Sequence, residues 1–218
     1  MRKLTASAAV LAALALPLPA ATATAASAEV EDPPPSDRIV IDVLTVNGSG
    51  CSAGTAAVAT ASDNTGFTVT YSDYLAQAGG NSSPTDFRKN CQINLRVHVP
   101  HGFTYAIAGA DYRGFAHLQA GATGMEQASY YHQGMSDTAS VSHTIKGSYS
   151  DNWQFSDRTD VAELVYKPCG EERNFNINTE LRVYRGGSDP AKTSFMAFDS
   201  ADGSVKTTYH FAWKKCSV

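Results

Sequence analysis

One short segment of this sequence has the pattern of a catalytic serine site. Residues Gly50–Gly54 read G-C-S-A-G and match G-x-S-x-G, the pattern of the nucleophile elbow in serine hydrolases. That elbow needs a strand, a strained turn and then a helix inside a parallel α/β sheet. The residues around this motif have a β-strand pattern, and Cys51 is expected in a disulfide. We therefore interpret the segment as a glycine-rich loop before a strand and assign no catalytic residue.

Two histidines, His98 and His101, are spaced three apart. On a helix this spacing would bring two imidazoles to one metal ion, but on a strand it turns them to opposite faces. A third ligand is also missing from the pattern. We expect a strand-surface histidine and a turn histidine, with no metal site and no cofactor.

An acid and an arginine, Asp111 and Arg113, are two residues apart and therefore share one face of a strand. We expect an ion pair that organises the structure. The alternative is a bidentate arginine that receives a ligand carboxylate. Both residues are kept as candidate ligand-binding residues.

Aromatic residues concentrate in the middle of the chain, where Tyr149, Trp153 and Phe155 follow one another closely. If exposed at a sheet edge, such rings could stack on sugar rings, and the alternative is that they belong to the core. These three residues are the candidate ligand-binding platform.

Acidic residues offer a second reading, in which a carboxylate pair hydrolyses glycans. The candidates are Asp160, Glu163 and Glu180. The distance between the two carboxylates that such a pair requires cannot be obtained from sequence, which leaves open whether the protein is an enzyme. We expect that it is not one.

The elements that must position these residues are β-strands. Apolar residues alternate with polar ones over 91–99 and again over 103–107, and Pro100-His101-Gly102 lies between the two runs. This pattern predicts two strands joined as a hairpin. Strong alternation also occurs over 174–183 and 205–214. Weaker strand patterns cover 38–46, 54–61, 66–71, 114–119, 126–133, 141–149 and 161–166.

Helical patterns are almost absent, and a single helical turn is expected over 73–78. About ten strands with one apolar and one polar face each predict an all-β fold, an antiparallel β-sandwich or a jelly-roll-like barrel.

Four cysteines allow three disulfide pairings. We expect pairing in sequence order, Cys51 with Cys91 and Cys169 with Cys216, because each bridge then lies within its own half of the chain. Each would close a loop of some 40 to 50 residues and contribute about 4 kcal/mol.

The chain begins with the features of a signal peptide over residues 1–28: Arg2 and Lys3, a long Ala/Leu-rich stretch, and Ala26-Ser27-Ala28. Residues 29–38 form a proline-rich tail, and residues 39–218 are expected to form a single secreted domain. An exported protein folds in an oxidising compartment, where disulfides persist.

The charge of the exported chain argues against two classes of partner. Removal of Arg2 and Lys3 with the signal peptide changes the net charge from −4 to −6. Binding to nucleic acids or to anionic membranes depends on basic patches, so neither partner is expected.

The sequence also resembles a known family, the domain of unknown function 4360, a group of small secreted proteins from bacteria and fungi. The resemblance covers residues 39–218 and implies secretion and two cysteine pairs, but no activity and no catalytic residue. It rests on Gly48-Ser49-Gly50-Cys51, Gly54-Thr55, Phe67-Thr68-Val69, Tyr74, Arg88-Lys89-Asn90-Cys91-Gln92, Pro100-His101-Gly102-Phe103, Asp111-Tyr112-Arg113-Gly114 and Tyr130-Tyr131.

Three functional hypotheses follow. The first is a secreted, non-catalytic module that binds a cell-wall polysaccharide or a protein outside the cell. The second is a secreted hydrolase that acts on glycans through a carboxylate pair. The third is a structural protein, or an inhibitor that presents the loop over residues 79–90.

Overall fold

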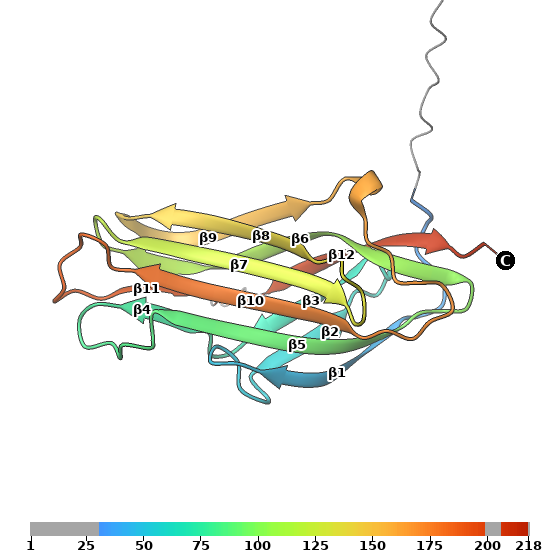
Figure 1. The fold of residues 1–218 in the computed structure, drawn as a ribbon, viewed down its shortest axis with the longest axis horizontal. Coiled ribbons are helices and arrows are strands. Elements are labelled where there is room, and N and C mark those ends of the chain that lie inside the picture. The colour runs from blue at the N-terminus through green and yellow to red at the C-terminus, as the bar shows by residue number, and fades with distance from the viewer. Residues whose placement is uncertain (1–30, 199–205, 218) are drawn as a thin grey trace, which may run out of the picture.

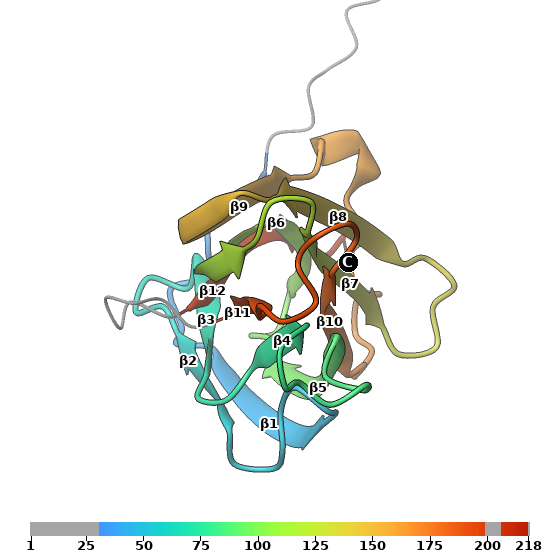
Figure 2. The same ribbon diagram turned by 90° about the vertical axis from the view of Figure 1, so that its left-hand side faces the viewer.

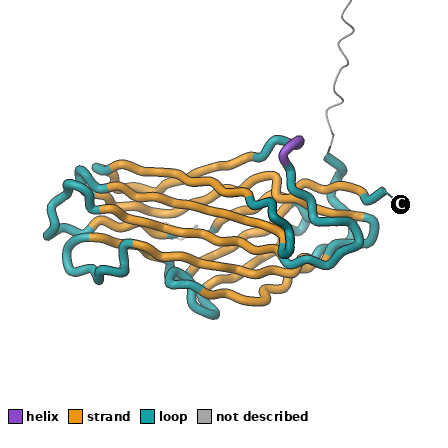
Figure 3. The backbone as a smooth tube through the Cα atoms, in the orientation of Figure 1, coloured by secondary structure: helices purple, strands orange, loops and turns teal. Residues whose placement is uncertain are grey.

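The computed structural model describes residues 31–198 and 206–217 of the 218-residue chain. The expected signal peptide lies outside these residues. The described part contains twelve β-strands and one short 3-10 helix (Figures 1 and 3). In chain order they are β1 (Val40–Asn47), β2 (Ala56–Thr60), β3 (Gly66–Tyr71), β4 (Leu75–Ala78), β5 (Arg88–His98), β6 (Phe103–Leu118), β7 (Thr123–His132), β8 (Ala139–Lys146), β9 (Tyr149–Arg158), η1 (Val161–Glu163), β10 (Phe175–Tyr184), β11 (Ser194–Ala197) and β12 (Thr207–Lys215).

The strands form two antiparallel sheets, which confirms the predicted all-β sandwich. The first sheet has five strands in the order β1-β5-β10-β7-β8, and Figure 1 shows them side by side. The second has seven strands in the order β2-β3-β12-β6-β11-β4, and β9 pairs with the other edge of β6. Figure 2 shows the two sheets from one end, enclosing the core.

The predicted hairpin over residues 91–107 is wrong. β5 pairs with β1 and β10, whereas β6 pairs with β12, β11 and β9, so Pro100-His101-Gly102 crosses from one sheet to the other. Alternation shows which side chains of a strand face inward, but it does not choose the strand's partner. Two runs with the same pattern can therefore face each other across the core as well as pair edge to edge.

Two local predictions are also wrong. Residues 73–78 contain the strand β4 in place of a helical turn, because Ser194–Ala197 of β11 pairs with Leu75–Ala78. Residues 161–166 contain η1 in place of a strand. Two strands, β9 and β11, were not expected from the sequence. β11 has only four residues, which is too short for a clear alternation.

Both disulfides form as predicted, between Cys51 and Cys91 and between Cys169 and Cys216. The core between the sheets is rich in aromatic side chains, among them the fully buried Trp213, Tyr105, Tyr209 and Phe67. Among the residues that the structure describes, no helix is long and apolar enough to cross a membrane.

Candidate functional site

The candidate aromatic platform lies on β9, and the structure turns much of it inward. Trp153 is only 4% exposed and packs edge-on against the ring of Phe198. Phe155 is half-buried and stacks on the imidazole of His143, with ring centroids 4.3 Å apart. Tyr149 is half-buried, and its hydroxyl donates a hydrogen bond to the carbonyl of Asn152 at 2.6 Å. Trp153 is therefore part of the core and cannot stack on a ligand at the surface.

Asp111 and Arg113 have different surroundings. Asp111 accepts hydrogen bonds from Arg158, at 3.0 Å, and interacts with Nε2 of His210 at 2.6 Å. Arg113 is exposed and has no ion-pair partner among the described residues. The expected ion pair between Asp111 and Arg113 does not form. Asp111 instead pairs with Arg158 of β9 and His210 of β12.

The environment of Asp111 shifts its acidity. Partial burial acts to raise the pKa of Asp111, but hydrogen bonds from Ser156, His210 and Arg158, together with the charge of Arg158, outweigh it and lower the pKa to about 2. A carboxyl whose pKa is lower in the folded state stabilises the fold above its ordinary pKa near 4. This stabilisation is lost as the pH falls through about 2.

Replacement of Asp111 by asparagine tests this linkage. We expect Asp111→Asn to lower the free energy of unfolding at pH 7 by about 1 kcal/mol, a value discounted for solvent screening, and to lower it less at pH 2. Denaturant unfolding at both pH values measures the effect. Asp151→Asn on β9 is the control, because among the residues with described positions its carboxylate accepts a bond only from the neighbouring Asn152 amide. Equal stability of Asp111→Asn and the wild type at pH 7 would contradict the prediction.

The residues of the serine motif lie in the loop between β1 and β2. Cys51 is bonded to Cys91, and the carbonyl of Ser52 accepts a hydrogen bond from the amide of Thr55. A strand, β2, follows the loop, so the strand-turn-helix geometry of a nucleophile elbow is absent from this segment.

The two histidines have different surroundings. His98 interacts through Nε2 with Asp42 of the neighbouring strand at 2.7 Å, and His101 lies in the exposed turn after β5. Among the described residues, no three His, Cys, Asp or Glu side chains are arranged to hold a metal ion.

The candidate glycosidase acids lie on different elements. Glu180 on β10 forms ion pairs with Arg88 and Arg182. Asp160 and Glu163 are exposed at η1. Glu180 is thus engaged by arginines, whereas the other two acids lie at η1.

A surface groove lies at the end of the sandwich where β4 leads into β5 and β10 leads into β11, at the left of Figure 1. We call it the Phe87 groove. Its volume is about 530 Å³, and it is flanked by Phe87 and Tyr184, which are 41% and 42% exposed. Neither ring was predicted from the sequence to be a surface group, although the loop over residues 79–90 was a candidate binding loop. Phe87 stands immediately before the alternating run of β5, so no pattern marked it as a surface residue.

Hydrogen bonds fix the loop that forms one wall of the Phe87 groove. The carboxylate of Asp86 accepts bonds from the amide of Ser83 at 3.0 Å and from Nζ of Lys89 at 2.9 Å. The amide of Gly80 donates to the carbonyl of Pro190 at 2.9 Å, which ties this loop to the β10–β11 loop. A groove with walls bonded in this way loses little conformational entropy when a ligand binds.

A second groove, of about 640 Å³, lies at the opposite end beside the Cys169–Cys216 disulfide. Lys167 lies in its wall, and burial lowers the pKa of this lysine. Its ammonium donates hydrogen bonds to the backbone carbonyls of Pro168 and Glu171. The charged group is thus engaged by its own loop.

Comparison with known proteins places the chain in a family. The model of the family described as "Domain of unknown function (DUF4360)" matches residues 37–216. The chain belongs to this family. An uncharacterized secreted protein of Arthroderma benhamiae is 32% identical to it over 184 residues, which cover 84% of this chain and 74% of the relative. The family model's match over residues 37–216 includes strands of both sheets and all four cysteines, so the resemblance inferred from the sequence is confirmed.

Proposed function

We propose that this protein is a secreted, non-catalytic binding module that takes an extracellular polysaccharide in the Phe87 groove. The observation that carries the proposal is the pair of exposed rings, Phe87 and Tyr184, at a groove with hydrogen-bonded walls. The secreted relative, the two disulfides and the signal-peptide pattern of residues 1–28 support an extracellular location.

The chemistry of the lining favours a sugar. Aromatic rings pack against the C–H faces of sugar rings, and hydroxyl and amide groups bond to sugar hydroxyls. The groove offers the hydroxyls of Ser82 and Ser83 and the amide of Gln77. Among the described residues that line it, Arg185 alone is charged. We therefore expect a neutral or weakly acidic polysaccharide.

Removal of both rings is the direct test. We expect the double variant Phe87→Ala/Tyr184→Ala to lose at least tenfold in affinity, because full burial of a Phe-sized side chain is worth about 1.5–3 kcal/mol and tenfold in affinity corresponds to about 1.4 kcal/mol. The mature protein is incubated with insoluble chitin, cellulose, β-glucan and peptidoglycan, and the bound fraction is measured as a function of polysaccharide concentration.

The matched control is Phe115→Ala, which removes a half-buried aromatic ring from the outer face of the other sheet. It should bind like the wild type. Retention that survives the loss of Phe87 and Tyr184 would overturn the assignment of the groove. A wild-type protein that is retained by none of the polysaccharides would overturn the proposed ligand class.

A further inference from the structure

Among the residues that the structure describes, a single acidic side chain lies wholly inside the sandwich. Glu126 projects from the inner face of β7 and is 0% exposed. Neither of its carboxylate oxygens has a hydrogen-bond partner among the residues that the structure describes. Burial of an ionised carboxylate without a partner is very costly, so a group in this position calls for an explanation.

The titratable groups around Glu126 come from both sheets: they are tyrosines, one acid, and His143 of β8, which lies directly opposite Glu126 in the β7–β8 pairing. Burial raises the pKa of Tyr71, Tyr112, Tyr130 and Tyr209 on β3, β6, β7 and β12, and the charge of Glu126 adds to this effect. The hydroxyls of Tyr71, Tyr112 and Tyr209 also lack partners among the described residues. The charged group that acts on Glu126 is Asp157 of β9, which has the same sign. Burial first, and then Asp157, raise the pKa of Glu126 well above its usual range.

Asp157 also belongs to the contact that closes one side of the sandwich. Nε2 of His143 on β8 lies 3.0 Å from both carboxylate oxygens of Asp157 on β9. β8 is the last strand of its sheet, and β9 pairs only with β6, so each has one free edge. The side chains of His143 and Asp157 are 24% and 17% exposed, so solvent reaches this contact. We call this contact the β8–β9 edge.

We propose that Glu126 makes the β8–β9 edge a pH-controlled opening, which stays closed while Glu126 carries a proton and opens to solvent when the proton is lost. An ionised Glu126 needs water, and its repulsion of Asp157 acts on one half of the contact that holds the edge closed. Edge strands with a single neighbour separate at lower free energy than strands paired on both sides.

The direction of the pH dependence follows from proton counting. The closed form binds one more proton than the open form at any pH between the ordinary pKa of a glutamate and that of Glu126 in the fold. The opening equilibrium therefore rises with pH, by at most tenfold per pH unit. His132, also on the inner face of β7, has the opposite effect, because burial lowers its pKa to about 4 and acidification then disfavours the fold.

Hydrogen exchange tests the proposal on the mature protein. Exchange of the β8 and β9 amides is measured from pH 5.5 to 9, corrected for intrinsic rates, in the wild type and in Glu126→Gln. The effect of His132 is common to both proteins and cancels in their ratio. We expect the ratio of the opening constants, wild type over variant, to rise at least tenfold across this range for the β8 and β9 amides. Amides of the central strand β10 that exchange without global unfolding should show no such rise. A constant ratio would overturn the proposal.

A second measurement needs no variant. The side-chain carboxyl carbon of Glu126 is followed by NMR in the wild-type protein as the pH is raised. We expect its chemical shift to remain that of a neutral acid at pH values where an ordinary glutamate is already ionised. A transition near the ordinary glutamate pKa, with the β8–β9 edge still closed, would show that ionisation does not open it.

Discussion

Replacement of Cys51 and Cys91 together by alanine should lower the free energy of unfolding by about 4 kcal/mol or more. The bridge closes a loop with a sequence separation of 40 residues, and the loop-entropy estimate for this length gives about 4 kcal/mol. Both cysteines are 1% exposed, so the double substitution also leaves a cavity in the core, which adds to the loss.

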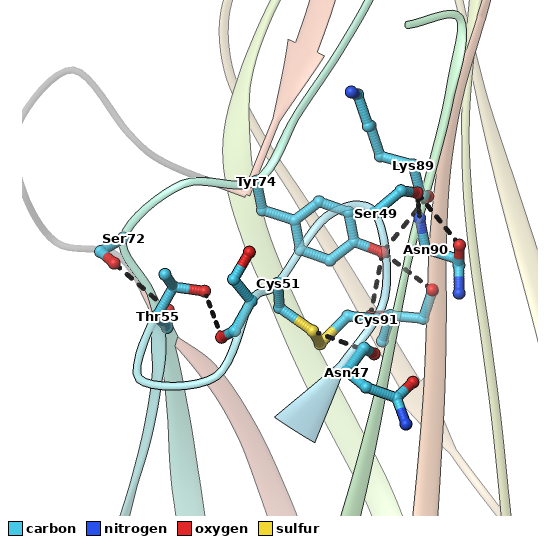
Figure 4. The surroundings of a disulfide bond; sticks show 11 residues. Asn47, Ser49, Cys51, Thr55, Ser72, Tyr74, Lys89, Asn90 and Cys91 are labelled. Atoms are coloured by element: carbon cyan, nitrogen blue, oxygen red, sulfur yellow. Dashed lines mark hydrogen bonds between the residues drawn. A yellow bond between two sulfur atoms is a disulfide. The ribbon is translucent and has the colours of Figure 1, made fainter. Parts of the chain in front are cut away.

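The surroundings of this disulfide increase the expected effect. Figure 4 shows the ring of Tyr74 beside the bridge, and the tyrosine hydroxyl donates a hydrogen bond to the carbonyl of Thr179 at 2.8 Å. A Cβ atom on Gly50 would come within 2.2 Å of this ring, so the loop packs tightly against it. The bridge thus fixes the loop between β1 and β2 to β5, across the two sheets.

The second disulfide is the matched control. Cys169 is exposed and Cys216 half-buried, so Cys169→Ala/Cys216→Ala should lose the loop-entropy contribution but create little cavity. We expect the smaller loss for this pair, and we also expect mild reductant to open the Cys169–Cys216 bridge first. Denaturant unfolding of both double variants, together with mass spectrometry of partially reduced protein, measures these effects. A larger loss for the exposed pair would contradict the prediction.

Asn64 to alanine is the second substitution with a large expected effect, a loss of about 3 kcal/mol. The side chain is buried in the turn between β2 and β3. Its Nδ2 donates to the carbonyls of Pro35 at 2.8 Å and Asp37 at 2.9 Å, and its Oδ1 accepts from the amide of Ile39 at 3.2 Å. Removal of these partners leaves buried backbone groups unsatisfied, at about 1–3 kcal/mol each.

The backbone of Asn64 contributes a separate part. Its φ is 58°, in the left-handed region that asparagine and glycine tolerate better than alanine. Its carbonyl accepts a hydrogen bond from Nε1 of Trp213 at 2.8 Å, which depends on this conformation. Glycine adopts this left-handed backbone conformation without strain, so Asn64→Gly loses only the contacts of the side chain. It should therefore lower the free energy of unfolding less than Asn64→Ala.

Two measurements check the Asn64 prediction. Denaturant unfolding gives the stability loss, and limited trypsin digestion after Arg38 reports release of the segment that the side chain holds. Asp63→Ala is the control in the same turn, because within the described part of the chain the Asp63 carboxylate bonds only to the exposed Thr65. Asn64→Ala with the stability and trypsin resistance of this control would refute the role assigned to Asn64.

Local patterns were sufficient for much of the fold. The alternation over β5, β10 and β12 predicts strands and their inward faces, because a side chain's face depends only on its position along its own strand. Which strands pair with each other was harder to predict from the sequence. The hairpin predicted between β5 and β6 failed because partner choice depends on contacts distant in the chain, such as Phe175 opposite Leu95.

The candidate sites show the same division. Trp153 was placed on a candidate platform because composition cannot tell a core ring from a surface ring. Phe87 and Tyr184 were missed because their exposure arises where two loops distant in sequence meet. No local sequence pattern identifies Glu126 either. Its burial without a hydrogen-bond partner among the described residues results from packing against tyrosines on three strands of the opposite sheet.

The sequence by itself determined the all-β class and the family. Each depends on residue types and short spacings, which are present in the chain before it folds. The tertiary structure alone decided which strands pair, which aromatic rings remain at the surface and which acid is enclosed. Burial and exposure are properties of how the two sheets face each other, so they arise only when distant segments come together.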